Sequence, residues 1–230
     1  MQNGASKVFR LREQQLFKGV SDEMLTGANV RFATFAPGDV ILHHGDSDSP
    51  FLLVVSGRVQ ALRFSEDGRE TGFAFVQSGE SYGETAIILG APAIASITAI
   101  TPVVVGLMER VEARRLFSDI GVSNALLRQL SNKLVRIVDN QVTLTRPSAY
   151  SRIYAVILAL LKESLDEGGA TLELPNQASI ALAANVSRET VSRVVKTLLA
   201  SGAITKEGRR FHVTDRSLIQ KLAAAAPLRK

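Results

Sequence analysis

Cysteine is absent from this chain of 230 residues. Without thiols the protein cannot form disulfides, and it cannot bind zinc or an iron–sulfur cluster through cysteine. The absence of disulfides is compatible with a cytoplasmic location, which we expect here. Residues 1–6 contain no apolar core, so the sequence shows no secretory signal.

The residue arrangements that mark common enzymes are also missing. The sequence has no Ser/His/Asp set at a familiar spacing, no glycine-rich loop ending in Gly-Lys-Ser/Thr, and no His-Glu-x-x-His motif. Glu80 and Glu84 form a weak candidate pair for acid chemistry, but such carboxylates more often cap turns. We therefore expect a protein that is not an enzyme and has no metal site.

Charged residues are missing from residues 85–108, and this run of 24 residues is long enough to cross a bilayer. However, Pro92 and Pro102 interrupt it, and residues 95–101 alternate between apolar and polar side chains. That period of two is typical of a β-strand. The sequence therefore predicts a buried β segment and no membrane span.

The net positive charge lies at one end of the chain. Residues 1–146 hold 15 basic and 15 acidic side chains, whereas residues 147–230 hold 12 and 7 and so account for the whole net charge of +5. A basic C-terminal region attached to a neutral body favours a polyanionic partner such as nucleic acid.

Residues 31–110 have the pattern of an antiparallel β structure. Short apolar runs, among them Val40–Leu42 and Phe51–Val55, are separated at close spacing by glycine. This pattern is typical of a sandwich or roll.

A helical pattern follows Glu109. One set of positions recurs at alternating intervals of three and four residues, as in the a/d seam of a coiled coil. The set is Leu127, Leu130, Leu134, Ile137, Gln141 and Leu144. This narrow seam favours a homodimer whose register is fixed by the polar Gln141; the alternative is an amphipathic helix packed on its own β region.

The last third of the chain has the element order of a winged helix-turn-helix. Pro147 ends the long helix. Asn176 is expected to cap a short helix through Ala184, and Ser187 a second helix that ends near Ala200. Residues 203–214 then predict a hairpin, which completes the motif.

These patterns together predict an α+β protein. We expect an antiparallel β-roll in residues 1–110. A dimerisation helix region is expected in residues 111–146. A winged helix-turn-helix that binds DNA is expected in residues 147–230.

The second helix of the motif separates apolar from polar side chains. Its valines and leucines predict a buried face. The opposite face carries Arg188, Glu189, Ser192, Arg193 and Lys196. Arginine can pair with guanine and glutamate with cytosine in the major groove, which makes this a candidate recognition helix. The alternative is a solvated face with Glu189 paired to Arg193.

Residues 187–204, SRETVSRVVKTLLASGAI, resemble the recognition helix and wing entry of the CRP/FNR family of bacterial regulators. The resemblance covers nearly the whole chain, because the β region is similar to the family's cyclic-nucleotide-binding-type roll and the heptad helix to its dimerisation helix. It implies a homodimer bound to double-stranded DNA, which contacts RNA polymerase if it activates transcription.

The resemblance also implies roles for individual residues. The base-reading positions are Arg188, Glu189, Ser192 and Arg193, and a palindrome with TGTGA-like half-sites is expected. Asn176 and Gln177 stand where Thr and Arg often contact phosphate, so those contacts are weakened or relocated. The remaining candidate phosphate ligands are Ser187, Lys196, Lys206, Arg209 and Arg210.

The family's effector pocket is altered in this sequence. The Gly-Glu pair of the cyclic-AMP branch is present as Gly83-Glu84. Ile94-Ala95 stand in place of the family's later Arg-Ser pair, so the arginine that neutralises the cyclic phosphate is missing. Ile137-Val138 also replace the family's adenine-contacting Thr-Ser. Burial of an unneutralised phosphate is costly, so we expect no cyclic nucleotide.

The candidate effector pocket is then formed by Gly83, Glu84, Thr85, Ile94 and Ala95, with either an unknown small ligand or none, and with Glu84 as a structural cap. Haem could use His43 or His44, but neighbouring histidines at a turn are more often a surface pair, so no cofactor is expected. The alternative to the DNA-binding regulator is a cyclic-nucleotide-dependent signalling module or regulator.

Overall fold

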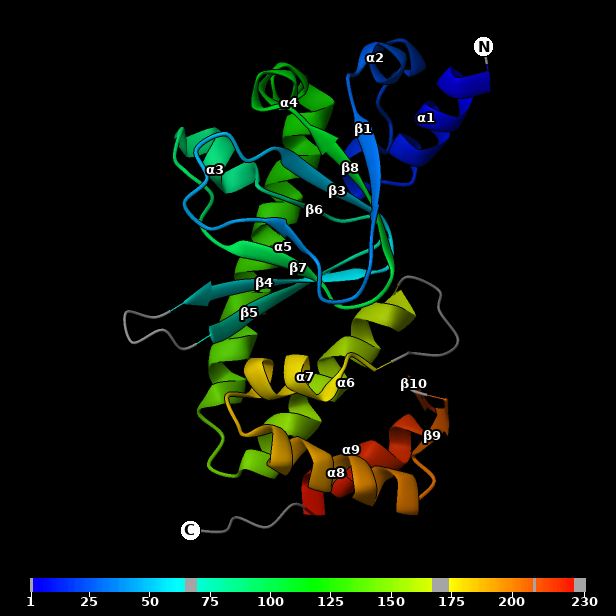
Figure 1. Ribbon diagram of the computed structural model, residues 1–230, viewed down its shortest axis with the longest axis vertical. Helices are drawn as coiled ribbons and strands as arrows, with labels where there is room; N and C mark the ends of the chain where they lie inside the picture. Colours follow the sequence, from blue (N-terminus) through cyan, green and yellow to red (C-terminus); the bar gives the residue numbers. More distant parts are fainter. Residues whose placement is uncertain (1, 65–69, 167–173, 209, 226–230) are drawn as a thin grey trace. The chain divides into compact units, whose positions relative to one another are not determined.

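The computed structural model describes residues 2–64, 70–166, 174–208 and 210–225. The chain separates into two compact units, an N-terminal unit of residues 1–135 and a C-terminal unit of residues 136–230 (Figure 1). The division falls within one long helix, α5 (Ile120–Leu144). The N-terminal unit thus extends past the expected domain boundary at residue 110.

The N-terminal unit is built around two four-stranded antiparallel sheets (Figure 1). One has the strand order β1-β8-β3-β6 and the other β2-β7-β4-β5. The strands are β1 (Arg31–Phe35), β2 (Val40–Leu42), β3 (Phe51–Ser56), β4 (Arg58–Phe64), β5 (Glu70–Gln77), β6 (Ser81–Tyr82), β7 (Ser96–Ala99) and β8 (Val103–Met108). The predicted antiparallel roll is confirmed.

Alternating side chains of both sheets form the core of the roll. Leu52, Val54, Val59, Ile97 and Val105 are among its fully buried members. Because successive side chains of a strand point to opposite faces, the other face of the first sheet is free to pack against helices. The uncharged run at residues 85–108 supplies β7 and β8 as predicted, although its first residues form a helix.

A second apolar core lies between the roll and the helices of the N-terminal unit. It includes Leu11, Phe17, Phe51, Leu116 and Leu126. The helices are α1 (Gln2–Arg12), the 3-10 turn η1 (Gln15–Phe17), α2 (Asp22–Gly27), α3 (Glu84–Leu89), α4 (Arg110–Phe117) and α5.

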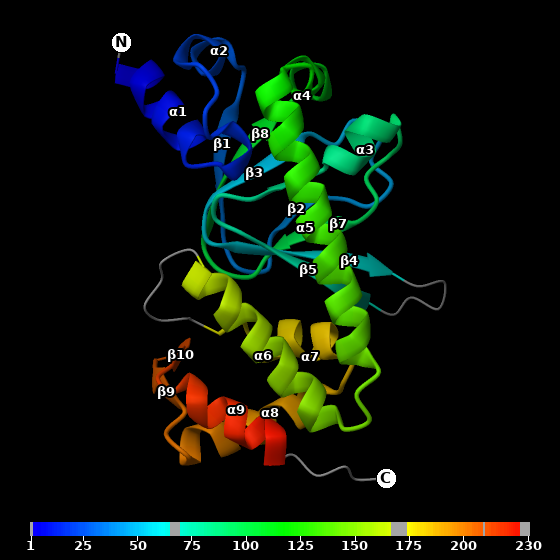
Figure 2. The ribbon, with the colours of Figure 1, turned by 180° about the vertical axis from the view of Figure 1, so that it is seen from behind.

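The apolar residues of helix α5 differ in their burial along its length. Val122, Ala125 and Leu126 are buried in the helical core of the N-terminal unit, and Leu130 is partly buried there too. Leu130, one of the predicted seam residues, therefore contacts the core of its own unit. A second set stays exposed in the single chain and is called here the α5 stripe: Leu127, Leu134, Val135, Ile137, Val138, Val142 and Leu144. Figure 2 shows the full length of the helix.

The C-terminal unit contains the winged helix-turn-helix in the predicted order. Its elements are α6 (Ala149–Asp166), α7 (Gln177–Ala184), α8 (Arg188–Ala200), β9 (Ile204–Glu207), β10 (Arg210–Val213) and α9 (Arg216–Ala225). Its core includes the fully buried Ile153, Ile157, Leu198 and Ile219. Across the described residues, none of the helices combines the length and the apolar character needed to cross a membrane.

Candidate nucleic-acid interface and effector pocket

The start of each helix of the helix-turn-helix is fixed by a side-chain cap. The Asn176 side chain accepts a hydrogen bond from the Ser179 amide at 2.9 Å, and Ser187 Oγ accepts one from the Thr190 amide at 3.3 Å. Both residues cap the helices for which the sequence predicted them. Between the helices, Asn185 adopts a left-handed conformation with φ of 48°, which asparagine tolerates better than most residues. The turn can therefore be short.

Helix α8 buries one face and exposes the other, as predicted. Val191, Val194 and Leu198 are fully buried against the rest of the C-terminal unit. The exposed residues Arg188, Glu189, Arg193 and Lys196, with the half-buried Ser192, form the opposite face, called here the α8 outer face. Its amphipathic pattern fixes the helix in the core while leaving these polar groups accessible to a partner.

Among the described residues, the charges on the α8 outer face are not neutralised by ion pairs. In the described part of the chain, no ion pair joins Glu189 to Arg193, and none involves Arg188 or Lys196. The pKa of Glu189 is lowered, first by a hydrogen bond from its own backbone amide, then by Ser187 and by the nearby charges of Arg188 and Arg193. The lowered pKa keeps the Glu189 carboxylate ionised, and an ionised carboxylate can accept a hydrogen bond from the amino group of cytosine.

The candidate phosphate ligands differ in their accessibility. Asn176, Ser187 and Lys206 are exposed, and Gln177 is half-buried. Asn176 and Ser187 already use their side chains as helix caps. Lys206, on β9, places its ammonium group 5.9 Å from the centre of the Phe211 ring. Arg209 and the side chain of Arg210 lie outside the described residues.

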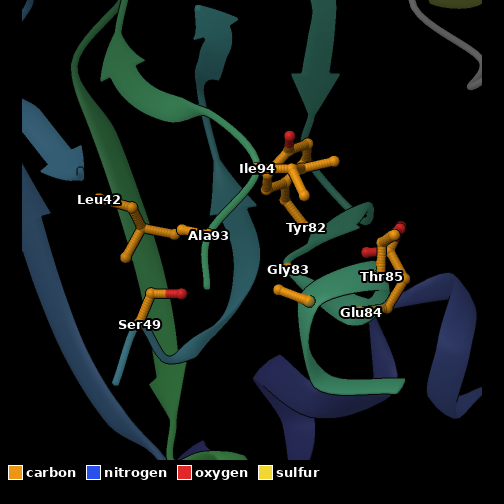
Figure 3. Close-up of a pocket in the computed structure, with 9 residues that line it drawn as sticks. Leu42, Ser49, Tyr82, Gly83, Glu84, Thr85, Ala93 and Ile94 are labelled. Atoms are coloured by element: carbon orange, nitrogen blue, oxygen red, sulfur yellow. The ribbon is translucent and has the colours of Figure 1, made fainter. Parts of the chain in front are cut away.

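A pocket in the roll includes most of the predicted effector residues (Figure 3). The pocket is small, with room for about one water molecule; the 270 Å³ of empty volume around its lining includes open solvent. The lining residues are Leu42, Ser49, Tyr82, Gly83, Glu84, Thr85, Ala86, Ala93 and Ile94. Four of the five predicted residues line the pocket. The fifth, Ala95, is not among the lining residues and is fully buried. None of the described lining residues is a lysine or arginine.

Lys133, a cation that contacts the lining residue Glu84, already has partners. Lys133 of α5 donates to Glu84 Oε1 at 2.7 Å and to the Ser81 carbonyl at 2.8 Å. The Glu84 side chain is only 3% exposed. The expectation that Glu84 is a structural cap is wrong, because its carboxylate pairs with a distant lysine instead. By contrast, Glu80 does cap a turn, since it accepts from the Gln77 amide at 3.0 Å.

Two buried polar atoms near this ion pair have no hydrogen-bond partner, the Tyr82 hydroxyl and Glu84 Oε2. The Lys133 ammonium lies 5.4 Å from the centre of the Tyr82 ring. Burial, and secondarily the negative charge of Glu84, raise the pKa of Tyr82, so the phenol stays protonated. These atoms could hydrogen-bond to a small polar ligand or to water, but they offer no positive charge to a phosphate.

His43 and His44 are both exposed, as expected for a surface pair. The backbone amide of His44 donates a hydrogen bond to Ser96 Oγ at 2.9 Å, which anchors the end of β2 to β7. Among the described residues, no cluster of three metal-ligating side chains occurs.

The sequence patterns gave no indication that Lys133 and Gln129 contact the roll. The Gln129 side chain donates a hydrogen bond to Ser81 Oγ at 2.8 Å. Gln129 and Lys133 lie one turn apart on the face of α5 that packs on the roll. Two polar residues spaced four apart within an apolar helix face could have indicated these contacts, because a buried polar group needs a hydrogen-bond partner.

Comparison with known proteins identifies both halves of the chain. The family model of the cyclic nucleotide-binding domain matches residues 32–119, and that of the Crp-like helix-turn-helix domain matches residues 151–222.

Two curated proteins are similar over nearly their whole length. The "CRP-like cAMP-activated global transcriptional regulator" of Mycobacterium tuberculosis is 26% identical over 214 residues, which cover 90% of this chain and 96% of that protein. The "Cyclic AMP receptor protein" of Thermus thermophilus is 26% identical over 216 residues, 93% of this chain and 98% of that protein.

Solved structures share the fold. FixK2 from Bradyrhizobium japonicum is 23% identical, with a TM-score of 0.67 over 86% of this chain and 100% of that one. A transcriptional regulator of the CRP family from Thermus thermophilus is 24% identical, with a TM-score of 0.67 over 86% and 98% of the two chains.

Proposed function

Because the chain belongs to the CRP/FNR family of transcriptional regulators, we propose that it is a homodimer that reads a palindromic DNA operator with helix α8. The observation that carries this proposal is the α8 outer face. It presents arginine, glutamate, serine and lysine from a helix whose other face is anchored in the core. A catalytic role is not proposed, since the family is one of regulators.

The contacts proposed for α8 follow from the chemistry of base edges. Arg188 or Arg193 can donate two hydrogen bonds to guanine O6 and N7, and Glu189 can accept from cytosine N4. A TGTGA-like half-site offers both kinds of edge on its two strands. Lys196, Ser187 and Lys206 would contact phosphates, which position the protein without reading sequence.

The α5 stripe supports the proposed dimer. Leu127 and Leu134 are 62% and 63% exposed in the single chain, one heptad apart. Large apolar side chains repeated along one helix face are typical of a helix-helix interface. In a twofold dimer the two α8 helices would enter successive major grooves about 34 Å apart. RNA polymerase is the proposed further partner if the protein activates transcription.

Replacing Arg193 with alanine should weaken binding to the operator by about 1–3 kcal/mol and relax selectivity at one base pair, because a bidentate contact to a base would be lost. The measurement is the affinity for an operator selected from random duplexes, compared with variants that carry each base substitution in turn.

Lys196→Ala provides the matched control for Arg193. Both residues are exposed cations on α8, but a phosphate contact carries no sequence information. The lysine variant should bind all sequences more weakly by a similar factor and depend less on salt. If Arg193→Ala behaves in this same uniform way, Arg193 does not read a base.

For the roll, we propose that cyclic AMP is not the effector. The names of two relatives mention cyclic AMP, but each relative shares only 26% identity with this chain. Two observations argue against a cyclic phosphate. The described lining residues include no cation, and Lys133 is already paired with Glu84. A phosphate buried here would lose its hydration without gaining a cation from the described lining residues.

Calorimetry with cyclic AMP and cyclic GMP should therefore show no binding in the submillimolar range. The matched variant carries Ile94→Arg and Ala95→Ser, which restore the family's phosphate-binding pair, and it should gain measurable affinity. Submillimolar binding by the unaltered protein would instead support a cyclic-nucleotide-dependent regulator.

A further inference from the structure

One arginine of the C-terminal unit contacts three backbone carbonyls with its guanidinium group. Arg152, near the start of α6, donates from Nη1 to the Arg146 carbonyl at 2.9 Å and from Nε to the Ala184 carbonyl at 3.0 Å. It also donates from Nη2 to the Asn185 carbonyl at 3.4 Å. No motif in the sequence singled this residue out.

The three carbonyls belong to two functionally different segments. Arg146 lies two residues after the end of α5, the helix that carries the α5 stripe, and its amide still bonds back to the Thr143 carbonyl at 3.2 Å. Ala184 and Asn185 end α7 and form the turn before Ser187, which caps α8. The guanidinium of Arg152 therefore connects the end of α5 to the turn from which α8 starts.

The chemistry of these contacts requires arginine. The planar guanidinium presents several N–H donors in a fixed fork, so it can bond to carbonyls from two segments at once and restrict their separation. A lysine ammonium is a compact donor on a flexible stem and cannot impose the same geometry. Since the acceptors are carbonyls that end helices, the positive charge is also favourable there.

We propose that Arg152 is a positioning residue that sets the place of α8 relative to the end of α5, and thereby the spacing between the two half-sites that the dimer reads. This inference rests on the proposed function of the protein as a dimer on a palindrome. Arg152 touches no base in this role. It acts through the turn before α8, and in a twofold molecule any displacement of α8 is repeated in the partner.

The test uses the full chain and an operator selected from random duplexes by the unaltered protein. Affinity is measured for this operator, for versions with one base pair inserted or removed at its centre, and for a single half-site. The variants are Arg152→Gln, Arg152→Lys and, as a control for lost positive charge in the same unit, the exposed Arg216→Ala. Thermal unfolding without DNA establishes that each variant is folded.

Arg152→Gln should lose about tenfold in affinity for the selected operator, equivalent to roughly one charged hydrogen bond. Its preference for the selected spacing over the altered spacings should shrink, while its affinity for the half-site is retained. Arg152→Lys should fall between this variant and the unaltered protein. Arg216→Ala should keep the spacing preference.

Two results overturn the inference. In the first, Arg152→Gln keeps the full spacing preference. In the second, it loses affinity for the half-site and the operator by the same factor, because Arg152 then only stabilises the helix-turn-helix. If the unaltered protein itself shows no preference for the palindrome over the half-site, the proposed function fails, and this outcome is recognisable without any variant.

Discussion

A chain with Leu134 and Ile137 both replaced by glutamate is expected to be a folded monomer that binds the palindromic operator at least about a hundredfold more weakly. Both side chains belong to the α5 stripe and are 63% and 49% exposed, so the substitutions remove few contacts within the chain. In a dimer they would bring four carboxylates into an apolar interface, where unpaired charge is costly. Once the two reading helices are no longer linked, the gain from binding both half-sites together is lost, and that gain is about 10²–10⁴.

Analytical ultracentrifugation should show the change in mass, and circular dichroism should show an unchanged helix content. Val111→Glu is the matched control, because Val111 is 77% exposed on α4, outside the stripe. The control should remain a dimer with unchanged DNA affinity. A double variant that stays dimeric would show that the α5 stripe is not the interface.

Replacing Lys133 with methionine is expected to destabilise the N-terminal unit by about 3 kcal/mol, because it leaves the buried carboxylate of Glu84 without its cation. The lysine stem is replaced by a side chain of similar shape, so the main loss is electrostatic. Glu84→Gln should cost less, because the Lys133 side chain is 24% exposed and can turn its ammonium group to water. In the double variant the two losses should not add, because the same contact is removed in both.

Urea unfolding followed by circular dichroism gives these stabilities, and hydrogen exchange of the β3 and β8 amides assigns the loss to the roll. Lys18→Met serves as the control, since Lys18 is exposed, and its effect should stay within about 0.5 kcal/mol. Equal stability of the Lys133 and Lys18 variants would mean that the ion pair with Glu84 contributes nothing.

The helix-turn-helix was predictable because its signals are local. Asn176 and Ser187 each cap a helix by bonding three residues ahead, and Gly202 adopts a φ of +75° just after α8. Caps, turns and the 3.6-residue period depend only on neighbours in the sequence, so they can be found without knowing the tertiary structure.

The contacts of the effector pocket and of Arg152 were not predictable, because they join residues far apart in the chain. Lys133 and Glu84 are 49 residues apart, and Arg152 and Ala184 are 32 apart. A pattern along one helix likewise does not distinguish packing on the same chain from packing on a partner. Leu130 and Leu134 share one heptad pattern, yet only Leu130 contacts the core of its own unit.

The exposed α5 stripe has a consequence for how strongly gene expression would depend on the amount of this protein. A chain that binds its operator only as a pair needs two copies for each binding event. While most copies are single, the occupied fraction of the operator then rises with the square of the protein concentration. A twofold change in synthesis would alter occupancy about fourfold, so the rate at which the cell makes this chain would itself be a regulatory input, even without a small-molecule effector.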